Sequence, residues 1–351
     1  MTKKKISRFR KVLIALISVV IISAIGVGYS FYQKIYSPNI SANLDKQFLF
    51  VPTGCNYQQL INIISQKKII VHSESFLWVA ERMSLSENIH PGKYELQKGM
   101  SNYDLVHLLR SGKQTPVKLV LNKFRTKNDF ASFVSSKLEI DSSVLLSCLN
   151  EESFLSQFGF NKEEVICLFV PNTYEFYWNT NADKFFIRMK KEYDLFWNEK
   201  RKQEAQNQKL TPTEVEILAS IIEEETNQND EKQTIASVYL NRLKKGMLLQ
   251  ADPTVKFALN DFTIRRIRET HIEQSKDSPY NTYRKTGLPP GPICTPSSTS
   301  IDAVLQPAET DYLYFCASST KPGYHVFAST LNAHQANAKL YQQWLNKRGI
   351  N

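Results

Sequence analysis

The chain has 351 residues, which is enough for a membrane anchor and two or three folded modules. Its formal net charge is +10, but six of the positive charges lie within residues 1–11, and no acidic residue precedes Asp45. The rest of the chain therefore carries only about +4, which argues against nucleic-acid binding. Its ordinary apolar and aromatic content excludes wholesale disorder.

Residues 12–32 form an uncharged apolar run about as long as the ~20 residues that a membrane-spanning helix needs. Because the basic residues 1–11 precede it, we expect a cytoplasmic N-terminal tail, one transmembrane helix and an exported remainder. A cleaved signal peptide is the alternative, but its apolar core is usually ~7–15 residues long and ends in small residues. The bulky Tyr29, Phe31 and Tyr32 end this run, so a retained anchor in the cytoplasmic membrane is favoured.

The cysteines do not form a metal or redox motif, because their number is odd and no Cys-x-x-Cys pair occurs. A disulfide stays open for an exported chain, but buried free thiols are the simpler expectation. We expect neither a metal nor a cofactor. The cysteines are Cys55, Cys148, Cys167, Cys294 and Cys316.

A pattern of apolar stretch, short turn and helix-like stretch occurs three times between residues 48 and 134. Each copy is typical of a strand, a turn with a helix-capping polar residue and an amphipathic helix. Small units of this kind resemble LysM-type glycan-binding modules, although a plain α+β spacer domain fits the same spacing. The three segments are FLFVPTGCNYQQLINII, YELQKGMSNYDLVHLL and LVLNKFRTKNDFASFV.

Two helices are expected after these repeats. One is long and charged and covers residues 183–205. The other begins at Thr211, which can cap it, with Pro212 at the first helical position and Glu214 completing a capping box. Its apolar residues recur at helical spacing and form one buried stripe, made of Val215, Leu218, Ala219 and Ile222.

Three consecutive glutamates, Glu223, Glu224 and Glu225, end the second helix. At ~100° per residue, Glu224 lies opposite the apolar stripe and Glu223 lies at its margin, whereas Glu225 points along the apolar side. An apolar site and neighbouring acids both raise the pKa of a carboxyl, which suits a general acid near neutral pH. An acidic helix end with three solvated carboxylates is the alternative that the spacing leaves open.

A further helix over residues 232–245 is expected to stop at Gly246. The segments after it are rich in proline, amides and tyrosines, and they cannot form a regular helix or a central strand. Such loops suit a polyhydroxylated ligand, although a purely structural loop has the same composition. The candidate binding residues are Glu223, Gln250, Asp252, Thr254, Tyr280, Asn281, Tyr283 and Pro290.

Four segments in the second half of the chain closely resemble the YceG-like family of endolytic murein transglycosylases. They are LASIIEEET, IASVYLNRLKKGMLLQADPTV, SPYNTYRKTGLPPGPICTPS and PAETDYLYFCAS. Four separated motifs in the same order are far more specific than any one of them. The earlier VPNTYEFYW resembles another family segment, with Asn172 where aspartate is usual, so no acidic role is expected there.

The resemblance implies that the last acid of the Glu223-Glu224-Glu225-Thr226 motif is catalytic, which again selects Glu225. It also implies a LysM-like membrane-proximal module, over residues 45–115, and a YceG-like catalytic region over residues 116–351 with its core at 211–340. The expected fold class is α+β, with one N-terminal transmembrane helix, a small LysM-like α+β module and a mixed α/β catalytic domain.

The reaction that the resemblance implies is cleavage inside peptidoglycan glycan strands, between N-acetylmuramic acid (MurNAc) and N-acetylglucosamine (GlcNAc), leaving 1,6-anhydro-MurNAc ends. The family's link to strand termination suggests contact with peptidoglycan synthases. Two alternatives stay open. One is a glycoside hydrolase that uses Glu225 with Asp252. The other is a non-enzymatic glycan-binding scaffold of the wall-synthesis machinery.

Overall fold

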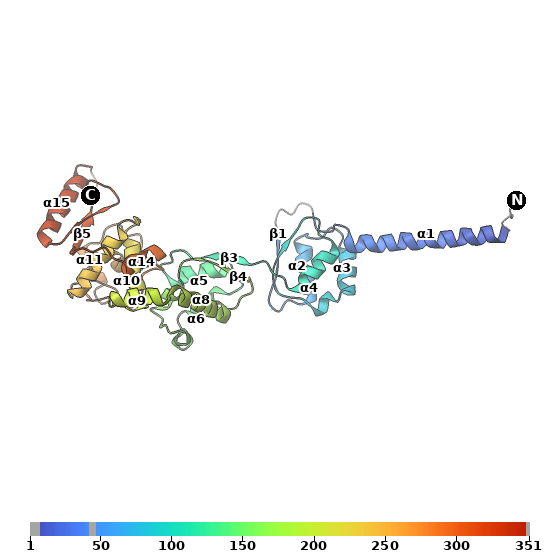
Figure 1. The fold of residues 1–351 in the computed structure, drawn as a ribbon, viewed down its shortest axis with the longest axis horizontal. Helices are drawn as coiled ribbons and strands as arrows, with labels where there is room; N and C mark the ends of the chain where they lie inside the picture. The colour runs from blue at the N-terminus through green and yellow to red at the C-terminus, as the bar shows by residue number, and fades with distance from the viewer. Residues whose placement is uncertain (1–7, 42–46, 349–351) are drawn as a thin grey trace. The chain divides into compact units, whose positions relative to one another are not determined.

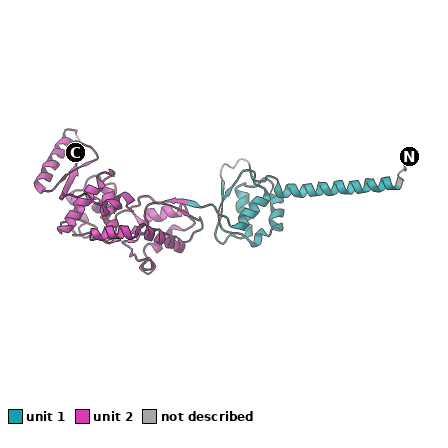
Figure 2. Ribbon diagram, in the orientation of Figure 1, with its two compact units in different colours: residues 1–117, 176–179 teal, residues 118–175, 180–351 magenta. Residues whose placement is uncertain are grey.

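The computed structural model describes residues 8–41 and 47–348, and the chain divides into two compact units (Figures 1 and 2). Unit 1 consists of residues 1–117 with 176–179, and unit 2 of residues 118–175 with 180–351. Both contain helices and short two-stranded sheets, so the expected mixture of helix and sheet is present. Residues 1–7 of the expected basic tail, and the first two residues of the expected 45–115 module, lie outside the described residues.

The first helix, α1 (Arg8–Tyr36), is longer than the expected 12–32. Within the described part of the chain, it is the one helix long and apolar enough to cross a membrane. Its apolar side chains are exposed, including Val20 at 66% and Ile22 at 68%. A core helix of a soluble domain would bury such side chains, so α1 is consistent with a single-pass membrane anchor.

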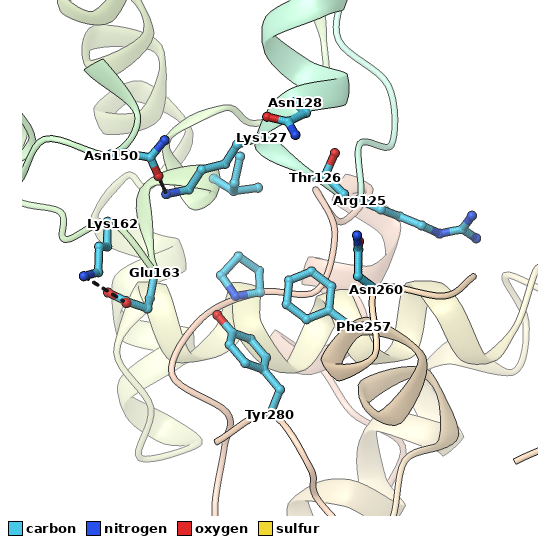
Figure 3. A pocket seen from close by; sticks show the side chains of 12 residues that line it. Arg125, Thr126, Lys127, Asn128, Asn150, Lys162, Glu163, Phe257, Asn260 and Tyr280 are labelled. Atoms are coloured by element: carbon cyan, nitrogen blue, oxygen red, sulfur yellow. Dashed lines mark hydrogen bonds and ion pairs between the residues drawn. The ribbon is translucent and has the colours of Figure 1, made fainter. Parts of the chain in front are cut away.

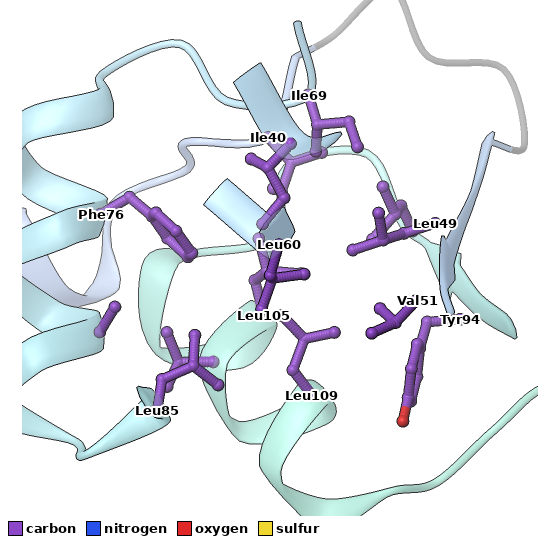
Figure 4. Close-up of a cluster of buried hydrophobic side chains, with 14 of the residues drawn as sticks. Ile40, Leu49, Val51, Leu60, Ile69, Phe76, Leu85, Tyr94, Leu105 and Leu109 are labelled. Atoms are coloured by element: carbon purple, nitrogen blue, oxygen red, sulfur yellow. The ribbon is translucent and has the colours of Figure 1, made fainter. Parts of the chain in front are cut away.

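The rest of unit 1 is a two-stranded antiparallel sheet covered by helices, and Leu49 lies opposite Tyr94 in its register. Leu49, Leu60, Tyr94 and Leu105 are all fully buried, and Figure 4 shows the strand side chains facing those of the helices. The elements are β1 (Gln47–Val51), α2 (Tyr57–Gln66), α3 (Ser73–Arg82), the 3-10 turn η1 (Leu85–Glu87), β2 (Gly92–Leu96) and α4 (Asn102–Ser111).

The strand, turn and helix pattern predicted three times is confirmed in β1–α2, β2–α4 and the pair β3 (Val117–Val120) and α5 (Lys127–Ser135). The residues that cap the three helices are Asn56, Ser101 and Thr126, and each side chain accepts a hydrogen bond from a backbone N–H of its helix. The first two copies pack together in unit 1, and the helix of the third belongs to unit 2. The likeness of unit 1 to a LysM module stays a prediction.

Unit 2 is mainly helical. Its short early elements are α6 (Ser142–Cys148), α7 (Glu152–Leu155), η2 (Ser156–Phe158), η3 (Val165–Leu168) and β4 (Thr173–Phe176), which pairs with β3. The later ones are α8 (Ala182–Phe196), α9 (Glu199–Asn207), α10 (Pro212–Glu225), α11 (Lys232–Lys244), α12 (Asp252–Ala258), α13 (Glu269–Gln274), α14 (Ser298–Leu305), β5 (Tyr314–Ala317), β6 (His325–Ala328) and α15 (Leu331–Asn346). All five cysteines are free, and Cys167 and Cys294 are buried.

The prediction of one long helix over residues 183–205 is wrong, because α8 ends before Trp197 and α9 starts after Asn198. The Trp197 ring is buried, and its Nε1–H donates a hydrogen bond of 2.7 Å to Oε1 of Glu216. The Asn198 side chain caps α9 by accepting from the backbone N–H of Arg201. The helix is therefore interrupted at Trp197 and Asn198, where the buried ring and the new cap are located.

Helix α10 lies at the centre of unit 2, where it packs against α9, α11, α12 and α14 (Figure 1). Its predicted capping box is confirmed between Thr211 and Glu214. The predicted apolar stripe is fully buried, as Val215 and Leu218 illustrate. Because α10 is held on several sides, the acidic residues at its C-terminal end have fixed positions.

Candidate active site

A cavity of about 280 Å³ lies at the C-terminal end of α10. Elements from well-separated parts of unit 2 build it, namely α10, α11, the start of α12 and the hairpin of β5 and β6. Four residues predicted from sequence meet there: Glu225, Gln250, Asp252 and Tyr283. The other lining residues are Tyr239, Arg242, Leu249, Phe315, Cys316, Ala317 and His325.

The carboxyl group of Glu225 has a raised pKa in this cavity. Burial raises its pKa to about 7, the hydrogen bond from Tyr239 opposes this rise, and the negative charge of Asp252 adds to it. The Tyr239 hydroxyl donates to Oε1 of Glu225 over 2.6 Å. The carboxyl group therefore keeps its proton in a substantial fraction of molecules near neutral pH.

Glu223 is held on a different side of α10. Its Oε2 accepts from Lys232 Nζ at 3.1 Å, from Ser300 Oγ at 2.6 Å and from Ser297 Oγ. Burial raises the pKa of Glu223, but the hydroxyls of Ser297 and Ser300 and the charge of Lys232 bring it below the ordinary value. Glu223 does not line the cavity of Glu225, and its contact with substrate stays a prediction.

Glu224 is fixed in the same way by cations. Arg125 donates to both of its oxygens, from Nε and Nη2, over 2.9 Å each, and Lys123 Nζ lies 3.3 Å away. Burial raises the pKa of Glu224, but the hydrogen bond and charge of Arg125 and the charge of Lys123 bring it below the ordinary value. The acid whose charge raises the pKa of Glu225 is therefore Asp252, and not the adjoining acids that the sequence pointed to.

Asp252 is the first residue of α12, and its Oδ1 accepts a hydrogen bond of 2.5 Å from the Tyr283 hydroxyl. Gln250 is exposed and has a left-handed backbone with φ of +51°. Its Oε1 accepts from Arg242 Nη1 at 3.4 Å, which turns the amide toward the cavity. Asp252, Tyr283 and Gln250 thus line the cavity of Glu225, and none of the three is a cation that could form an ion pair with it.

Thr254 and Asn281 do not line the cavity, although the sequence placed them among the binding candidates. Both are fully buried. Thr254 donates to the carbonyl of Ala251 over 2.7 Å, and the Asn281 amide donates to the carbonyl of Ile272 over 2.9 Å. Their hydrogen bonds hold the loops that carry Asp252 and Tyr283. Their contact with substrate stays a prediction that this placement does not favour.

Tyr280 and Pro290 also lie away from Glu225. Tyr280 packs on Phe257, with 4.7 Å between ring centroids, and it lines another cavity of unit 2. Pro290 is partly buried and precedes Gly291, where a Cβ would collide with the carbonyl oxygen of Glu163. The proline-set loop therefore packs closely against neighbouring backbone.

Arg242 and Tyr239 are cavity residues that sequence reasoning did not select for the site. Arg242 is 7% exposed, and its guanidinium donates to the carbonyls of Leu313 and Leu249 over 2.7 Å each. Burial lowers the pKa of Arg242. Tyr239 is buried in α11, and nothing in the spacing along the chain indicated that its hydroxyl reaches Glu225.

His325 is a further residue that sequence reasoning missed. Its backbone N–H donates to Oε1 of Glu231 over 2.7 Å, and its ring Nδ1 lies 3.1 Å from Oε2 of the same carboxylate. Glu231 is itself buried, so it holds the imidazole firmly at the cavity wall. The other ring nitrogen, Nε2, is left for a ligand.

A protonated carboxyl, a carboxylate, a guanidinium and an imidazole thus share one small polar cavity. This set can hold a polyhydroxylated ligand and can pass a proton between Glu225 and a ligand oxygen. Among the described residues, no group of three or more His, Cys, Asp or Glu side chains is placed to hold a metal ion.

Comparisons with known proteins match most of the chain. The model of the YceG-like family matches residues 49–340. An endolytic murein transglycosylase of Bacillus subtilis is 29% identical over 313 residues, covering 85% of each chain. One of Streptococcus pneumoniae is 27% identical over 346 residues, covering 88% of this chain and 61% of that protein.

A solved structure of a yceG-like protein also matches most of this chain. The 2.6 Å crystal structure of a yceG-like protein from Listeria monocytogenes matches 83% of this chain and 98% of its own, with a TM-score of 0.55 and 30% identity. The family match and this structure together span unit 1 and unit 2. The chain therefore belongs to the YceG-like family.

Proposed function

We propose that this protein is an endolytic peptidoglycan lytic transglycosylase, anchored in the cytoplasmic membrane by α1. Relatives that cover most of the chain carry the name endolytic murein transglycosylase. The single observation that carries the proposal is the state of Glu225, a carboxyl with a pKa raised to about 7 inside a polar cavity. Its substrate is the glycan strand, cut between MurNAc and GlcNAc.

In the first step, protonated Glu225 gives its proton to the glycosidic oxygen as the bond between that oxygen and the anomeric carbon of MurNAc breaks. The GlcNAc side leaves as an alcohol, and positive charge develops at the anomeric centre. Asp252, oriented by Tyr283, supplies negative charge on the same cavity wall. Opposite charge placed in advance stabilises such a transition state.

In the second step, the C6 hydroxyl of the same MurNAc attacks the anomeric carbon and gives its proton to the Glu225 carboxylate. This forms the 1,6-anhydro ring and restores protonated Glu225, so no water is consumed. Because the nucleophile belongs to the sugar that it attacks, correct orientation replaces a bimolecular encounter. One acid/base residue therefore suffices for the cycle.

A hydrolase is the second candidate, because Glu225 and Asp252 line one cavity. In that case Asp252 acts as nucleophile or base, and water enters the product. Mass spectrometry of the products separates the two reactions, since hydrolysis adds one water to each cut strand and transglycosylation adds none.

The decisive variant is Glu225→Gln, which keeps the shape of the side chain but removes the acid. We expect cleavage of purified glycan strands to fall ~10²–10⁴-fold, the usual contribution of a general acid or base. Glu199→Gln, at a side chain that is 92% exposed, is the matched control and keeps the wild-type rate. If Glu225→Gln still released anhydro-ended fragments at the wild-type rate, the assignment of Glu225 would be wrong.

We also propose that the N-terminus lies in the cytoplasm, that both folded units are exported, and that cleavage ends nascent strands beside peptidoglycan synthases. The basic residues before the apolar run support this orientation. An anchor at α1 would attach the protein to the membrane. Where the cell has an outer membrane, the exported space is the periplasm.

A further inference from the structure

Unit 2 contains a second cavity, of about 470 Å³, that the proposed reaction at Glu225 does not use (Figure 3). The start of α5, residues 150–166, the end of α12 and the loop at Tyr280 enclose it. We call it the Lys127 cavity. None of the residues that line it also lines the Glu225 cavity.

The side chains of the Lys127 cavity are more cationic than anionic. Arg125, Lys127 and Lys162 line it, against one carboxylate, Glu163. Arg125 is already paired through two hydrogen bonds with Glu224, and Lys162 lies 3.9 Å from Glu163. Burial lowers the pKa of Lys127, and the charges of Glu163 and Glu152 oppose this fall without reversing it, so the charge of Lys127 is only partly compensated.

The Lys127 ammonium is half-buried and is bound only to neutral oxygens. Its Nζ donates to the carbonyl of Leu149 and to Oδ1 of Asn150, over 2.8 Å each, and Figure 3 shows the second of these bonds. An ammonium has three N–H donors, so one is left for a ligand. Among the carboxylates of the described ranges, none forms an ion pair with Lys127.

An aromatic wall stands across the cavity from Lys127. Figure 3 shows Phe257 and Tyr280 on the side away from Lys127 and Asn150. Their ring centroids are 4.7 Å apart. Burial raises the pKa of Tyr280 to about 12, so this wall carries no charge near neutral pH. The cavity therefore suits a ligand that joins a carboxylate to an apolar or amide-containing chain.

Two short connections relate this cavity to Glu225. Asp252 begins α12 in the Glu225 cavity, and Phe257 lies five residues along the same helix, a rise of about 7.5 Å. Glu224, which binds Arg125 of the Lys127 cavity, directly precedes Glu225. Helix α12 and the neighbouring acids at the end of α10 thus connect the two cavities within unit 2.

We propose that the Lys127 cavity binds the carboxylate-bearing stem peptide attached to MurNAc, with Lys127 holding a carboxylate and Phe257 and Tyr280 packing on the peptide chain. This inference rests on the proposed function, because it takes peptidoglycan as the substrate. It adds that the enzyme selects strands whose stems are present and acidic. A neutral sugar would add no counter-charge to this partly compensated ammonium.

The test is a titration of the full-length protein in detergent with a synthetic stem tripeptide, L-alanyl-γ-D-glutamyl-L-lysine, and with the same peptide amidated at its carboxyl groups. We expect the acidic peptide to bind more tightly than its amidated twin. Lys127→Gln weakens binding of the acidic peptide about tenfold or more, because a hydrogen bond to a charged group is lost. Lys127→Arg, which keeps the charge, retains most of the affinity.

The control is Lys191→Gln on α8, which removes one charge from an exposed side chain and leaves both affinities unchanged. Equal affinity for the two peptides, or an unchanged affinity in Lys127→Gln, would overturn the proposal. Thermal melting of each variant shows whether it is folded. Because binding of a free peptide requires no cleavage, failure of the transglycosylase assignment would appear in the strand assay and not in this one.

Discussion

The carboxyl group of Glu225 receives a hydrogen bond from the neutral hydroxyl of Tyr239, whereas Glu223 and Glu224 each face lysine or arginine. This difference in partners gives opposite pKa shifts to acids that adjoin one another in sequence. Glu223 and Glu224 stay ionised and bind neighbouring segments. Glu225 alone among the three is suited to deliver a proton near neutral pH.

The raised pKa of Glu225 predicts the pH dependence of kcat/KM. The first step needs the protonated form, which predominates below the pKa of about 7 and is lost as the pH rises through it. We expect kcat/KM to be level on the acid side and to fall tenfold per pH unit well above pH 7. Initial rates on purified strands between pH 5 and pH 9 measure this limb, and a fall centred near pH 4.5 would contradict it.

Replacing Tyr239 by phenylalanine tests the cause of this pKa. The hydroxyl stabilises the ionised form of Glu225, so Tyr239→Phe shifts the alkaline limb of kcat/KM to higher pH. A hydrogen bond to a charged group contributes ~1.5–3 kcal/mol, which corresponds to about one to two pH units. A shift in the acid direction would mean that Tyr239 does not act through Glu225.

At the scale of elements, α10 also carries Glu216, a carboxyl buried against Trp197 and Cys167. Burial raises the pKa of Glu216 to about 8, against the opposing hydrogen bonds from Trp197 and Cys167. The folded protein therefore holds Glu216 neutral at pH values where the unfolded chain, with an ordinary pKa of ~4.3, has released the proton. Its contribution to stability is complete below that unfolded value and is lost as the pH rises toward 8.

Glu216→Gln removes this loss of stability at high pH, because the amide is neutral at every pH and still accepts a hydrogen bond from Trp197. We expect the free energy of unfolding at pH 8 to exceed that of the wild type by about 4–5 kcal/mol, since each unit of pKa difference between ~4.3 and about 8 corresponds to ~1.4 kcal/mol, and the gain to vanish below about pH 4.3. Urea unfolding of both proteins at several pH values measures the difference. A gain that did not depend on pH would show that the carboxyl is not neutral in the folded state.

For the whole molecule, the exposed apolar surface of α1 is consistent with a single-pass membrane anchor. We expect the full-length chain to sediment with membranes and to resist an alkaline carbonate wash, because ~20 apolar residues hold a helix in a bilayer. A chain that starts at residue 37 should stay in the supernatant. The membrane fraction should contain the intact N-terminal peptide by mass spectrometry, and a chain cut near residue 32 would instead indicate a signal peptide.

Local features of the chain are predictable because they depend on residues close in sequence. The capping box at Thr211, the buried stripe that begins at Val215 and the three capped strand-to-helix units follow from spacing within about ten residues. The same helical phase distinguishes Glu225 from Glu224, because it depends only on their positions along one helix. The end of α8 is not predictable in this way, because burial of Trp197 against Glu216 depends on packing between helices.

The sequence by itself determined the long apolar helix α1, the start of α10 and the position of Glu225 on the apolar side of α10, because periodicity and capping act along the chain. The tertiary structure decided which groups meet Glu225. It brought Tyr239 and His325 to the cavity, buried Thr254 within α12 and placed Lys127 beside a second cavity. These outcomes arise from side chains far apart in sequence, whose contacts exist only once α10, α11 and the β5–β6 hairpin have packed together.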